Sequence, residues 1–205
     1  MHKYPQDFWN SRYSDPEYVY GHEPNAFFEE QLLQLSPGRM LLPAEGEGRN
    51  AVFAAKNGWD VQAFDWSEVG QRKAYQWAQE NGVNINYEVG KAEEVEYALG
   101  AYDALACIFS HFSPAIRKEV TRKFLSYLKP GGHIIFECYS KAQRDYQEKY
   151  NSGGPQSVDM LYSEAEVREE FPDINFEFLE TKEVELREGA HHVGLASVIR
   201  FVGKK

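Results

Sequence analysis

The chain has 205 residues, a formal net charge of −10 and 42% hydrophobic residues, which fits one globular domain with a sizeable core. The excess of acidic residues argues against nucleic-acid phosphates and anionic membrane surfaces as partners, so we expect a small-molecule partner. No apolar run approaches the roughly 18 residues of a membrane span, and the N-terminus lacks the apolar segment of a signal peptide. Cys107 and Cys138 lie in apolar runs without a C-x-x-C motif, which favours reduced thiols, a cytoplasmic protein and no metal site.

The first 36 residues are predicted to form an irregular, aromatic-rich opening followed by a helix. Prolines interrupt the opening, and Asn25 can cap a helix whose apolar side contains Phe28 and Leu32. A solvent-exposed tail would carry fewer aromatic residues, so we expect the segment to fold back on the domain. It either closes one edge of the sheet or covers a bound ligand, and the two interpretations are compatible.

Residues 39–67 form the unit around which the rest of the chain is organised. The pattern predicts a buried strand at 40–42, a glycine-bearing turn at 44–48, an amphipathic helix, and a second strand at 61–64 that ends on Asp65. Glycines let the turn approach a ligand, the helix N-terminus offers free N–H groups, and an acid at the tip of the second strand can bind two ribose hydroxyls. This unit predicts an adenosine-type cofactor.

Two glutamates in the turn indicate which adenosine cofactor is bound. Glu45 and Glu47 alternate with Gly46 and Gly48, whereas a dinucleotide site places a pyrophosphate at this turn. Two carboxylates repel a pyrophosphate and attract a ligand with an ammonium and a sulfonium. The turn therefore favours S-adenosylmethionine over NAD. A structural turn with solvated glutamates is the alternative.

The middle of the chain alternates predicted helices and strands. Ser67 can cap a helix that extends to Gln79, and Trp66 either lies against an adenine or packs in the core. Strands are expected at 84–89, 104–109 and 133–139, with a helix at 113–128 and a turn at 129–132. His111 follows the central strand, where open α/β sheets bind ligands.

The last third of the chain is predicted to contain a polar insert, a short helix and a β-hairpin. Residues 140–163 suit a segment that covers a substrate, and residues 163–171 begin with a capping box. Alternating runs at 174–186 and 193–202 predict the hairpin. His191 and His192 lie at its tip and cannot chelate one metal, because successive strand residues point to opposite faces.

The run EGEGRNAVFAA resembles motif I of class I S-adenosylmethionine-dependent methyltransferases, most of all the small bacterial members related to the tellurite-resistance and thiopurine methyltransferases. YVYGHEPNAF, the PGG turn and EGAHHVG resemble further segments of these proteins. The resemblance covers nearly the whole chain. It implies an α/β fold with a doubly wound, seven-stranded, mostly parallel Rossmann-like sheet that ends in an antiparallel hairpin. The single domain 1–205 would comprise a lid and helix (1–36), a cofactor-binding core (37–140) and a substrate-side insert with the hairpin (141–205).

The chain departs from the family pattern at three positions. Leu42 replaces the acid that usually orients the methionine amino group, and Glu45 is the expected substitute. Ala44 replaces a glycine, which we expect to matter little because a small side chain suffices there. Lys91 lies near the place of the aspartate that usually binds the adenine amino group, so Glu93 or the Ala92 backbone would take that contact.

The resemblance and the residue patterns together give a set of expected site residues. Substrate contacts are expected from Tyr20, His111, Tyr139 and His192, with His111 as the first and His192 as the second choice of general base. The expected cofactor contacts are Tyr20, Asn25, Ala44, Glu45, Gly46, Gly48, Asn50, Asp65, Trp66, Ser67, Ala92, Glu93 and Cys107.

The predicted function is methyl transfer from S-adenosylmethionine to a small-molecule acceptor, either a thiol or an oxyanion of tellurium or selenium. An anionic acceptor would need positive groups such as Arg12 or Arg49, because the chain is acidic. The alternatives are a non-catalytic protein that binds S-adenosylmethionine or S-adenosylhomocysteine and, less favoured, an NAD(P)-dependent oxidoreductase. The oligomeric state is left open between monomer and homodimer.

Overall fold

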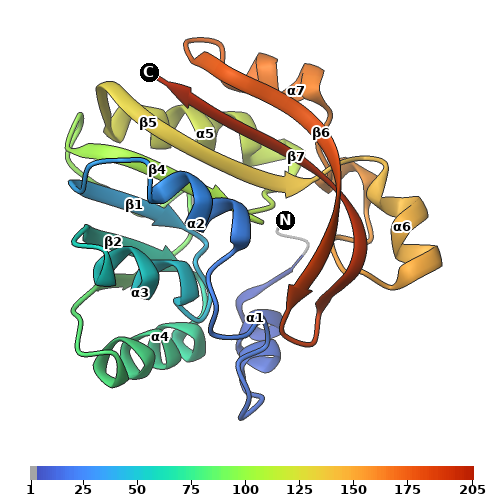
Figure 1. Ribbon diagram of the computed structural model, residues 1–205, viewed down its shortest axis with the longest axis horizontal. Helices are drawn as coiled ribbons and strands as arrows, with labels where there is room; N and C mark the ends of the chain where they lie inside the picture. Colours follow the sequence, from blue (N-terminus) through green and yellow to red (C-terminus); the bar gives the residue numbers. More distant parts are fainter. Residues whose placement is uncertain (1–3) are drawn as a thin grey trace.

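A seven-stranded sheet forms the middle of the molecule, with the strand order β3-β2-β1-β4-β5-β7-β6 (Figure 1). This computed structural model describes residues 4–205. The strands β1 to β5 are parallel, whereas β7 pairs antiparallel with both β5 and β6. The strands span Arg39–Pro43 (β1), Asp60–Asp65 (β2), Asn86–Val89 (β3), Tyr102–Ile108 (β4), Leu128–Tyr139 (β5), Asn175–Glu188 (β6) and His192–Lys204 (β7). The predicted doubly wound sheet with a terminal hairpin is confirmed.

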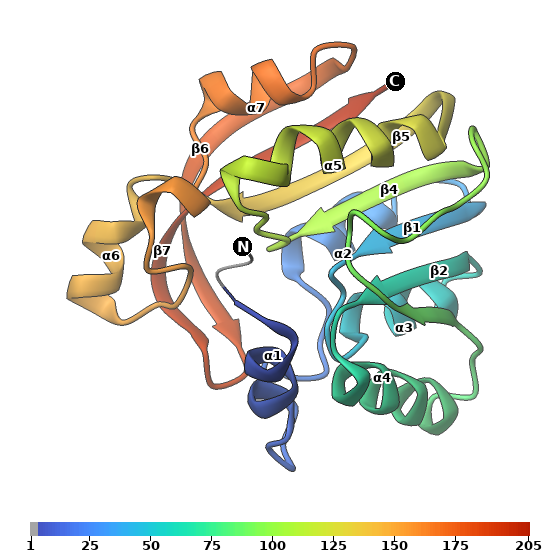
Figure 2. The ribbon, with the colours of Figure 1, turned by 180° about the vertical axis from the view of Figure 1, so that it is seen from behind.

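Helices cover both faces of the sheet (Figures 1 and 2). One face is packed by α2 (Ala26–Leu32), α3 (Arg49–Lys56) and α4 (Glu68–Glu80), and the other by α5 (Pro114–Tyr127) and α7 (Glu164–Glu170). The remaining helices, α1 (Gln6–Tyr13), α6 (Gln143–Tyr150) and the 3₁₀ turn η1 (Val158–Met160), lie in the segments that flank the carboxyl ends of the strands. Strand order reverses between β1 and β4, and a ligand site is expected at such a reversal.

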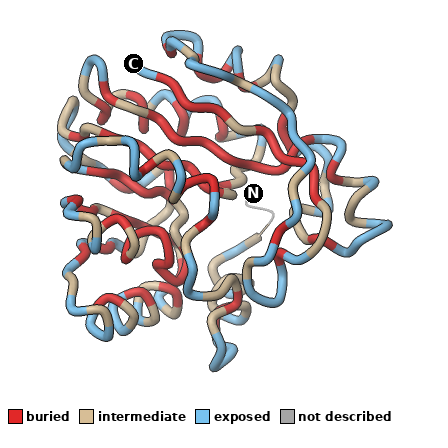
Figure 3. The backbone as a smooth tube through the Cα atoms, viewed as in Figure 1, coloured by how far each residue is buried: buried red, intermediate tan, exposed pale blue. Residues whose placement is uncertain are grey.

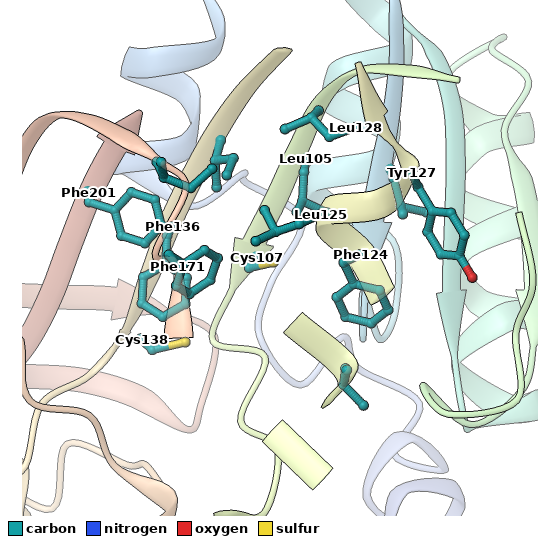
Figure 4. Packing of buried hydrophobic residues seen from close by; sticks show 14 of the residues in the cluster. Leu105, Cys107, Phe124, Leu125, Tyr127, Leu128, Phe136, Cys138, Phe171 and Phe201 are labelled. Carbon is teal, nitrogen blue, oxygen red and sulfur yellow. The ribbon is translucent and has the colours of Figure 1, made fainter. Parts of the chain in front are cut away.

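The core consists of the two sides of the central strands, which are buried along most of their length (Figure 3). On β1, Met40 and Leu42 pack on the side of α3 and α4, whereas Leu41 packs on the side of α5. This alternation is the pleat of a strand that is covered on both faces. On the α5 side, Phe136 of β5 stacks on Phe201 of β7 with ring centroids 4.9 Å apart, and Phe171 packs against both (Figure 4).

The structure corrects three expectations about local structure. The opening of the chain is helical in α1, and the insert after β5 contains α6. The expected turn at 129–132 belongs to β5, because the Gly131 N–H donates to the Lys205 carbonyl and the Lys205 N–H donates to the Gly132 carbonyl. In each case a partner distant in sequence supports the backbone, and a short isolated segment would not form the element alone.

Candidate functional site

A cavity of about 500 Å³ lies at the carboxyl ends of the central parallel strands. The turn after β1 and the tips of β2 and β4 form one wall. The opposite wall combines α1, the segment 151–156 and the tip of the β6–β7 hairpin. Figures 1 and 2 show α1 and the hairpin tip on the same side of the molecule, and the Ala190 N–H donates to the Val19 carbonyl at 3.0 Å. Segments from both ends of the chain therefore enclose the site.

The turn between β1 and α3 is held in a left-handed conformation at several positions. Ala44, Gly46 and Gly48 have φ values of 51°, 65° and 87°. A Cβ on Gly48 would lie 2.5 Å from the Cβ of Ala74, so glycine is needed for α3 to pack closely on α4. Our expectation for Ala44 was wrong: the position requires positive φ as well as a small side chain, and alanine is strained there.

Asp65 fixes this turn to the end of β2. Its Oδ2 accepts from the Gly46 N–H at 3.1 Å, and its Oδ1 accepts from the Ser67 N–H at 2.8 Å. Burial raises the pKa of Asp65 to about 6, and these backbone donors lower it in part. The Trp66 N–H is a further donor to this carboxylate, which lines the cavity. Ribose binding by Asp65 stays a prediction.

The two glutamates of the turn have different surroundings. Glu45 lines the cavity, and its Oε1 accepts from the Ala51 N–H of α3 at 2.7 Å. Burial raises the pKa of Glu45 to about 7. Glu47 is buried away from the cavity, where it accepts from the Val19 N–H at 2.8 Å and pairs with Lys73 at 2.5 Å. The expectation that both glutamates meet a ligand is therefore wrong for Glu47, because this side chain fastens the N-terminal segment to α4.

Most of the predicted site residues line the cavity. The exceptions are Asn25, Gly48, Ser67 and Cys107. Ser67 caps α4 and donates to Asn10, and Cys107 is buried in the core between β4 and α5. The predicted residues that do line the cavity are Tyr20, Ala44, Glu45, Gly46, Asn50, Asp65, Trp66, Ala92, Glu93, His111, Tyr139 and His192.

Asn25 connects several buried polar groups behind the cavity. It caps α2 by accepting from the Phe28 N–H, and its Nδ2 donates to Glu137 at 2.7 Å and to Glu188 at 2.9 Å. Its own N–H donates to Asn50 at 2.9 Å. Glu137 is fully buried and forms a short ion pair with Arg200. The predicted cofactor residue Asn25 is therefore a connector between α2, β5 and the hairpin.

His192 and Glu188 form a buried pair at the hairpin tip. The Nδ1 of His192 lies 3.0 Å from Glu188 Oε2, which also accepts from Arg49 at 2.7 Å. Burial lowers the pKa of His192, so the ring is neutral near pH 7 and donates its Nδ1 proton to the carboxylate. Burial would raise the pKa of Glu188, but Arg49 and His192 together lower it to about 2.

The ring of His111, unlike that of His192, is held by backbone groups on both sides. Its Nδ1 donates to the Met160 carbonyl at 2.9 Å, and its Nε2 accepts from the Tyr139 N–H at 3.2 Å. Burial lowers the pKa of His111 to about 4. Both ring nitrogens are occupied by backbone groups, so His111 presents no free lone pair to the cavity. This geometry conflicts with the expectation of His111 as the first-choice base.

Sequence reasoning did not identify Tyr13 and Phe109, which also line the cavity. Tyr13 is buried against the turn, and a Cβ on Gly46 would lie 2.7 Å from its hydroxyl. Phe109 follows β4 with a φ of 50°, an uncommon conformation for a bulky residue that often marks a functional site. Its ring lies 4.6 Å from that of His192. No local sequence signal indicates a positive φ at a phenylalanine.

The strand order with an antiparallel β7, and a cavity beside the β1–α3 turn, define the fold of class I methyltransferases. Comparison with known proteins agrees: residues 43–132 match the family described as "Methyltransferase domain". The chain is 27% identical over 123 residues to the ubiquinone biosynthesis O-methyltransferase of Rickettsia conorii. This match covers 59% of the chain and 42% of that relative, so the chain spans less than half of the relative's length.

Solved structures share the fold at low sequence identity. TehB from Haemophilus influenzae superposes with a TM-score of 0.72 at 15% identity, covering 98% of this chain and 66% of that one. A methyltransferase from Methanosarcina mazei gives 0.68 at 16% identity, covering 89% and 98%. A structure described for the conversion of a disulfide bond into a thioacetal group during echinomycin biosynthesis gives 0.77 at 14% identity, covering 98% and 92%.

Residues 43–132 thus match a methyltransferase domain, and the chain shares the fold of solved S-adenosylmethionine-dependent methyltransferases, which implies S-adenosylmethionine as the cofactor. The cavity fits this cofactor, because the β1–α3 turn brings backbone close to it and the acidic side chains of Glu45 and Asp65 line it. Within residues 4–205, no helix is long and apolar enough to cross a membrane.

Proposed function

We propose that this protein transfers the methyl group of S-adenosylmethionine to a small-molecule acceptor that carries a thiol or a hydroxyl group, with His192 as the general base. The observation that supports this most is the buried Glu188–His192 pair on the cavity wall opposite the β1–α3 turn. A carboxylate that orients a neutral imidazole is the arrangement that general-base catalysis requires.

The donor side of the cavity is formed by the turn and the tips of β2 and β3. When bound, S-adenosylmethionine supplies an electrophilic methyl group on a sulfonium. Asp65 would accept the ribose hydroxyls, and the Gly46 backbone leaves room for the methionine part because it carries no side chain. Trp66 and Ala92, with Glu93, line the cavity after β2 and β3, where the adenine would lie.

The acceptor side is formed by the hairpin tip and the aromatic rings around it. His192 donates its Nδ1 proton to Glu188, so the Nε2 lone pair is the one that can remove a proton from an acceptor. Among residues 4–205, no hydrogen-bond partner of this Nε2 is found. The rings of Tyr20, Phe109 and Tyr139 lie 4.5, 4.6 and 5.5 Å from the imidazole. They keep water away from the in-line displacement and restrict the acceptor to one approach.

If His192 acts as a general base, the acceptor should be one that must lose a proton to react. A thiol or hydroxyl must lose a proton to react well, whereas an oxyanion of tellurium or selenium has no proton to lose at the reacting atom. The Rickettsia conorii relative is named as an O-methyltransferase, which favours including hydroxyl acceptors beside thiols. Arg49 is paired with Glu188, so it does not offer a free charge to an anionic acceptor.

A second candidate is a non-catalytic protein that binds the cofactor. Leu42 and Lys91 stand where the family pattern has acidic residues, and this departure is what favours the second candidate. It predicts cofactor affinity without turnover of any acceptor.

The test has two stages. Calorimetric titration with S-adenosylmethionine, S-adenosylhomocysteine and NADH is expected to show binding of the first two and none of NADH. Methyl transfer is then measured on matched small thiols and phenols, with tellurite and selenite as acceptors that need no base. Turnover of a thiol or phenol supports the proposal. Turnover of tellurite or selenite alone contradicts a role for His192 as base, and cofactor binding without turnover favours the second candidate.

A further inference from the structure

The first strand lacks the acid that would pair with the amino group of an amino-acid ligand. Leu42, near the carboxyl end of β1, is fully buried and apolar. S-adenosylmethionine carries an α-ammonium group on its methionine part, which in the proposed binding mode would lie beside the turn. A charged ammonium in a largely enclosed cavity needs a carboxylate or strong acceptors, because unpaired buried charge is very unfavourable. Another group in the cavity must therefore receive it.

Three carboxylates line the cavity among residues 4–205, namely those of Glu45, Asp65 and Glu93. Asp65 is held by the Gly46 and Ser67 N–H groups at the tip of β2, the position for ribose. Glu93 lies in the loop after β3, on the adenine side. Glu45 is the carboxylate of the β1–α3 turn itself. It would therefore be the carboxylate beside the methionine part if that part lies along the turn.

Glu45 is held firmly enough to act as a fixed acceptor. Its backbone N–H donates to the Phe64 carbonyl at 3.1 Å, and its Oε1 accepts from the Ala51 N–H at 2.7 Å. Asn50 also hydrogen-bonds this carboxylate. A carboxylate has about four acceptor positions, so it can accept a further donor from a bound cation. The charged and polar groups near it are Arg49 and Asn50 on α3 and Tyr87 on β3.

We propose that Glu45 binds the α-ammonium group of the methyl donor and releases a proton to solvent when the donor binds. The proposal rests on the proposed function, because it takes S-adenosylmethionine and its product as the ligands of this cavity.

The protonation of the free protein supports this coupling. Burial raises the pKa of Glu45 to about 7, and the Ala51 N–H, Arg49 and Asn50 only partly oppose it. The carboxyl group is therefore partly protonated near neutral pH. A bound ammonium favours the charged carboxylate and lowers its pKa, so binding must release the proton. Affinity for a ligand with an ammonium should accordingly weaken as the pH falls below 7.

The test is calorimetric titration of S-adenosylhomocysteine at pH 7 in two buffers that differ in ionisation enthalpy. The difference in apparent enthalpy gives the number of protons released, and we expect about half a proton per ligand. 5′-Methylthioadenosine has the same adenosine part without the amino acid. It is expected to bind with no release, which also controls for any proton shift at Asp65.

Two variants of the same turn separate the roles of its glutamates. Glu45→Gln should abolish the proton release and weaken S-adenosylhomocysteine binding by about tenfold or more, with little effect on 5′-methylthioadenosine. Glu47→Gln is the matched control, because Glu47 binds Val19 and Lys73 outside the cavity. It should keep the proton release. Circular dichroism of both variants checks that they fold.

The outcomes distinguish this inference from the proposed function. If wild-type protein binds S-adenosylhomocysteine with the same proton release as 5′-methylthioadenosine, Glu45 does not bind the ammonium, while the cofactor assignment stands. The same conclusion follows if folded Glu45→Gln binds S-adenosylhomocysteine as tightly as wild type. Absence of any S-adenosylhomocysteine binding to wild type overturns both proposals.

Discussion

The two walls of the cavity shift the pKa values of their carboxyl groups in opposite directions. The donor wall is the β1–α3 turn with the tips of β2 and β3, and the acceptor wall is the tip of the β6–β7 hairpin. On the donor wall, burial raises the pKa of Glu45 to about 7 and that of Asp65 to about 6. Backbone N–H groups, with Arg49 and Asn50 beside Glu45, oppose this rise only in part. On the acceptor wall, burial acts on Glu188 as well, but Arg49 and His192 lower its pKa to about 2. The difference lies in the direct ion pairs: Glu188 pairs with Arg49 and His192, whereas among residues 4–205 no ion pair of Glu45 or Asp65 is found.

This contrast shows which wall has its charges paired in the free protein. The acceptor wall is neutralised by its own residues, so Glu188 can orient His192 before any ligand arrives. The donor wall keeps acidic groups whose charge is disfavoured until a cationic ligand binds. Donor binding should therefore change the protonation of its wall, and acceptor binding should not.

Removal of the base is expected to have the largest effect on activity. His192→Ala should lower kcat on a thiol or phenol acceptor by about 10²–10⁴-fold, because it removes the lone pair that accepts the proton. His111→Ala should lower kcat less, but it should destabilise the fold by about 1–3 kcal/mol, because the Met160 carbonyl and Tyr139 N–H lose their partners. Steady-state kinetics and urea unfolding measure both. Equal kcat losses would contradict the different roles assigned to the two histidines.

Removal of the Glu188 carboxylate tests whether this group orients His192 and pairs with Arg49. Glu188→Gln should lower kcat about 100-fold by loosening His192 and should cost about 3 kcal/mol of stability, because Arg49 loses its buried partner. The matched control on the same strand is Glu185→Gln, whose exposed pair with Arg187 should contribute less than 1 kcal/mol. Similar unfolding free energies for the two variants would show that the buried pair is unimportant.

The donor wall predicts how stability depends on pH. For Glu45 and Asp65 the folded pKa lies above the unfolded value, so their contribution is fully present below about pH 4 and is lost as the pH rises through 6 and 7. We expect the unfolding free energy of the free protein to fall by about 3 kcal/mol between pH 4 and 7, after allowance for the partial exposure of Glu45. Saturating S-adenosylhomocysteine should flatten this slope. A free energy that rises across this window would contradict the raised pKa values.

Glu188 predicts the opposite slope at lower pH. Its folded pKa is depressed, so its contribution is present above about pH 4.3 and is lost as the pH falls toward 2. Chemical unfolding of wild type and Glu188→Gln in parallel isolates the contribution of Glu188 to the unfolding free energy. Only wild type should lose this contribution as the pH falls.

The smallest expected effect concerns the backbone of the donor wall. Ala44→Gly should stabilise the protein by about 1 kcal/mol, because alanine is strained at a φ of 51° and glycine is not. Ala54→Gly, inside α3, is the matched control and should destabilise by at least about 1 kcal/mol. Urea unfolding at pH 5 measures both. Loss of stability in Ala44→Gly would indicate that the Ala44 side chain makes a contact that outweighs the strain.

The sequence predicted the features that depend on neighbouring residues. The alternation of apolar residues gave the strands and their burial, and the capping box at Ser163 and Glu166 forms as expected. Glycines and an acid at fixed spacing predicted the turn of 44–48 and the position of Asp65 beside it. These patterns are readable because backbone dihedrals and burial repeat with the local period of the element.

Only the tertiary structure decided where the polar side chains point. Glu45 and Glu47 are equivalent in the sequence, yet one lines the cavity and the other meets Lys73 of α4. His111 looked like the better base until Met160 and Tyr139 were found on its two nitrogens. Glu188 becomes an orienting group because Arg49, far away in the sequence, lies beside it. The partners of a buried polar group come from other elements, so its charge and direction follow from how the elements pack and not from its neighbours in the chain.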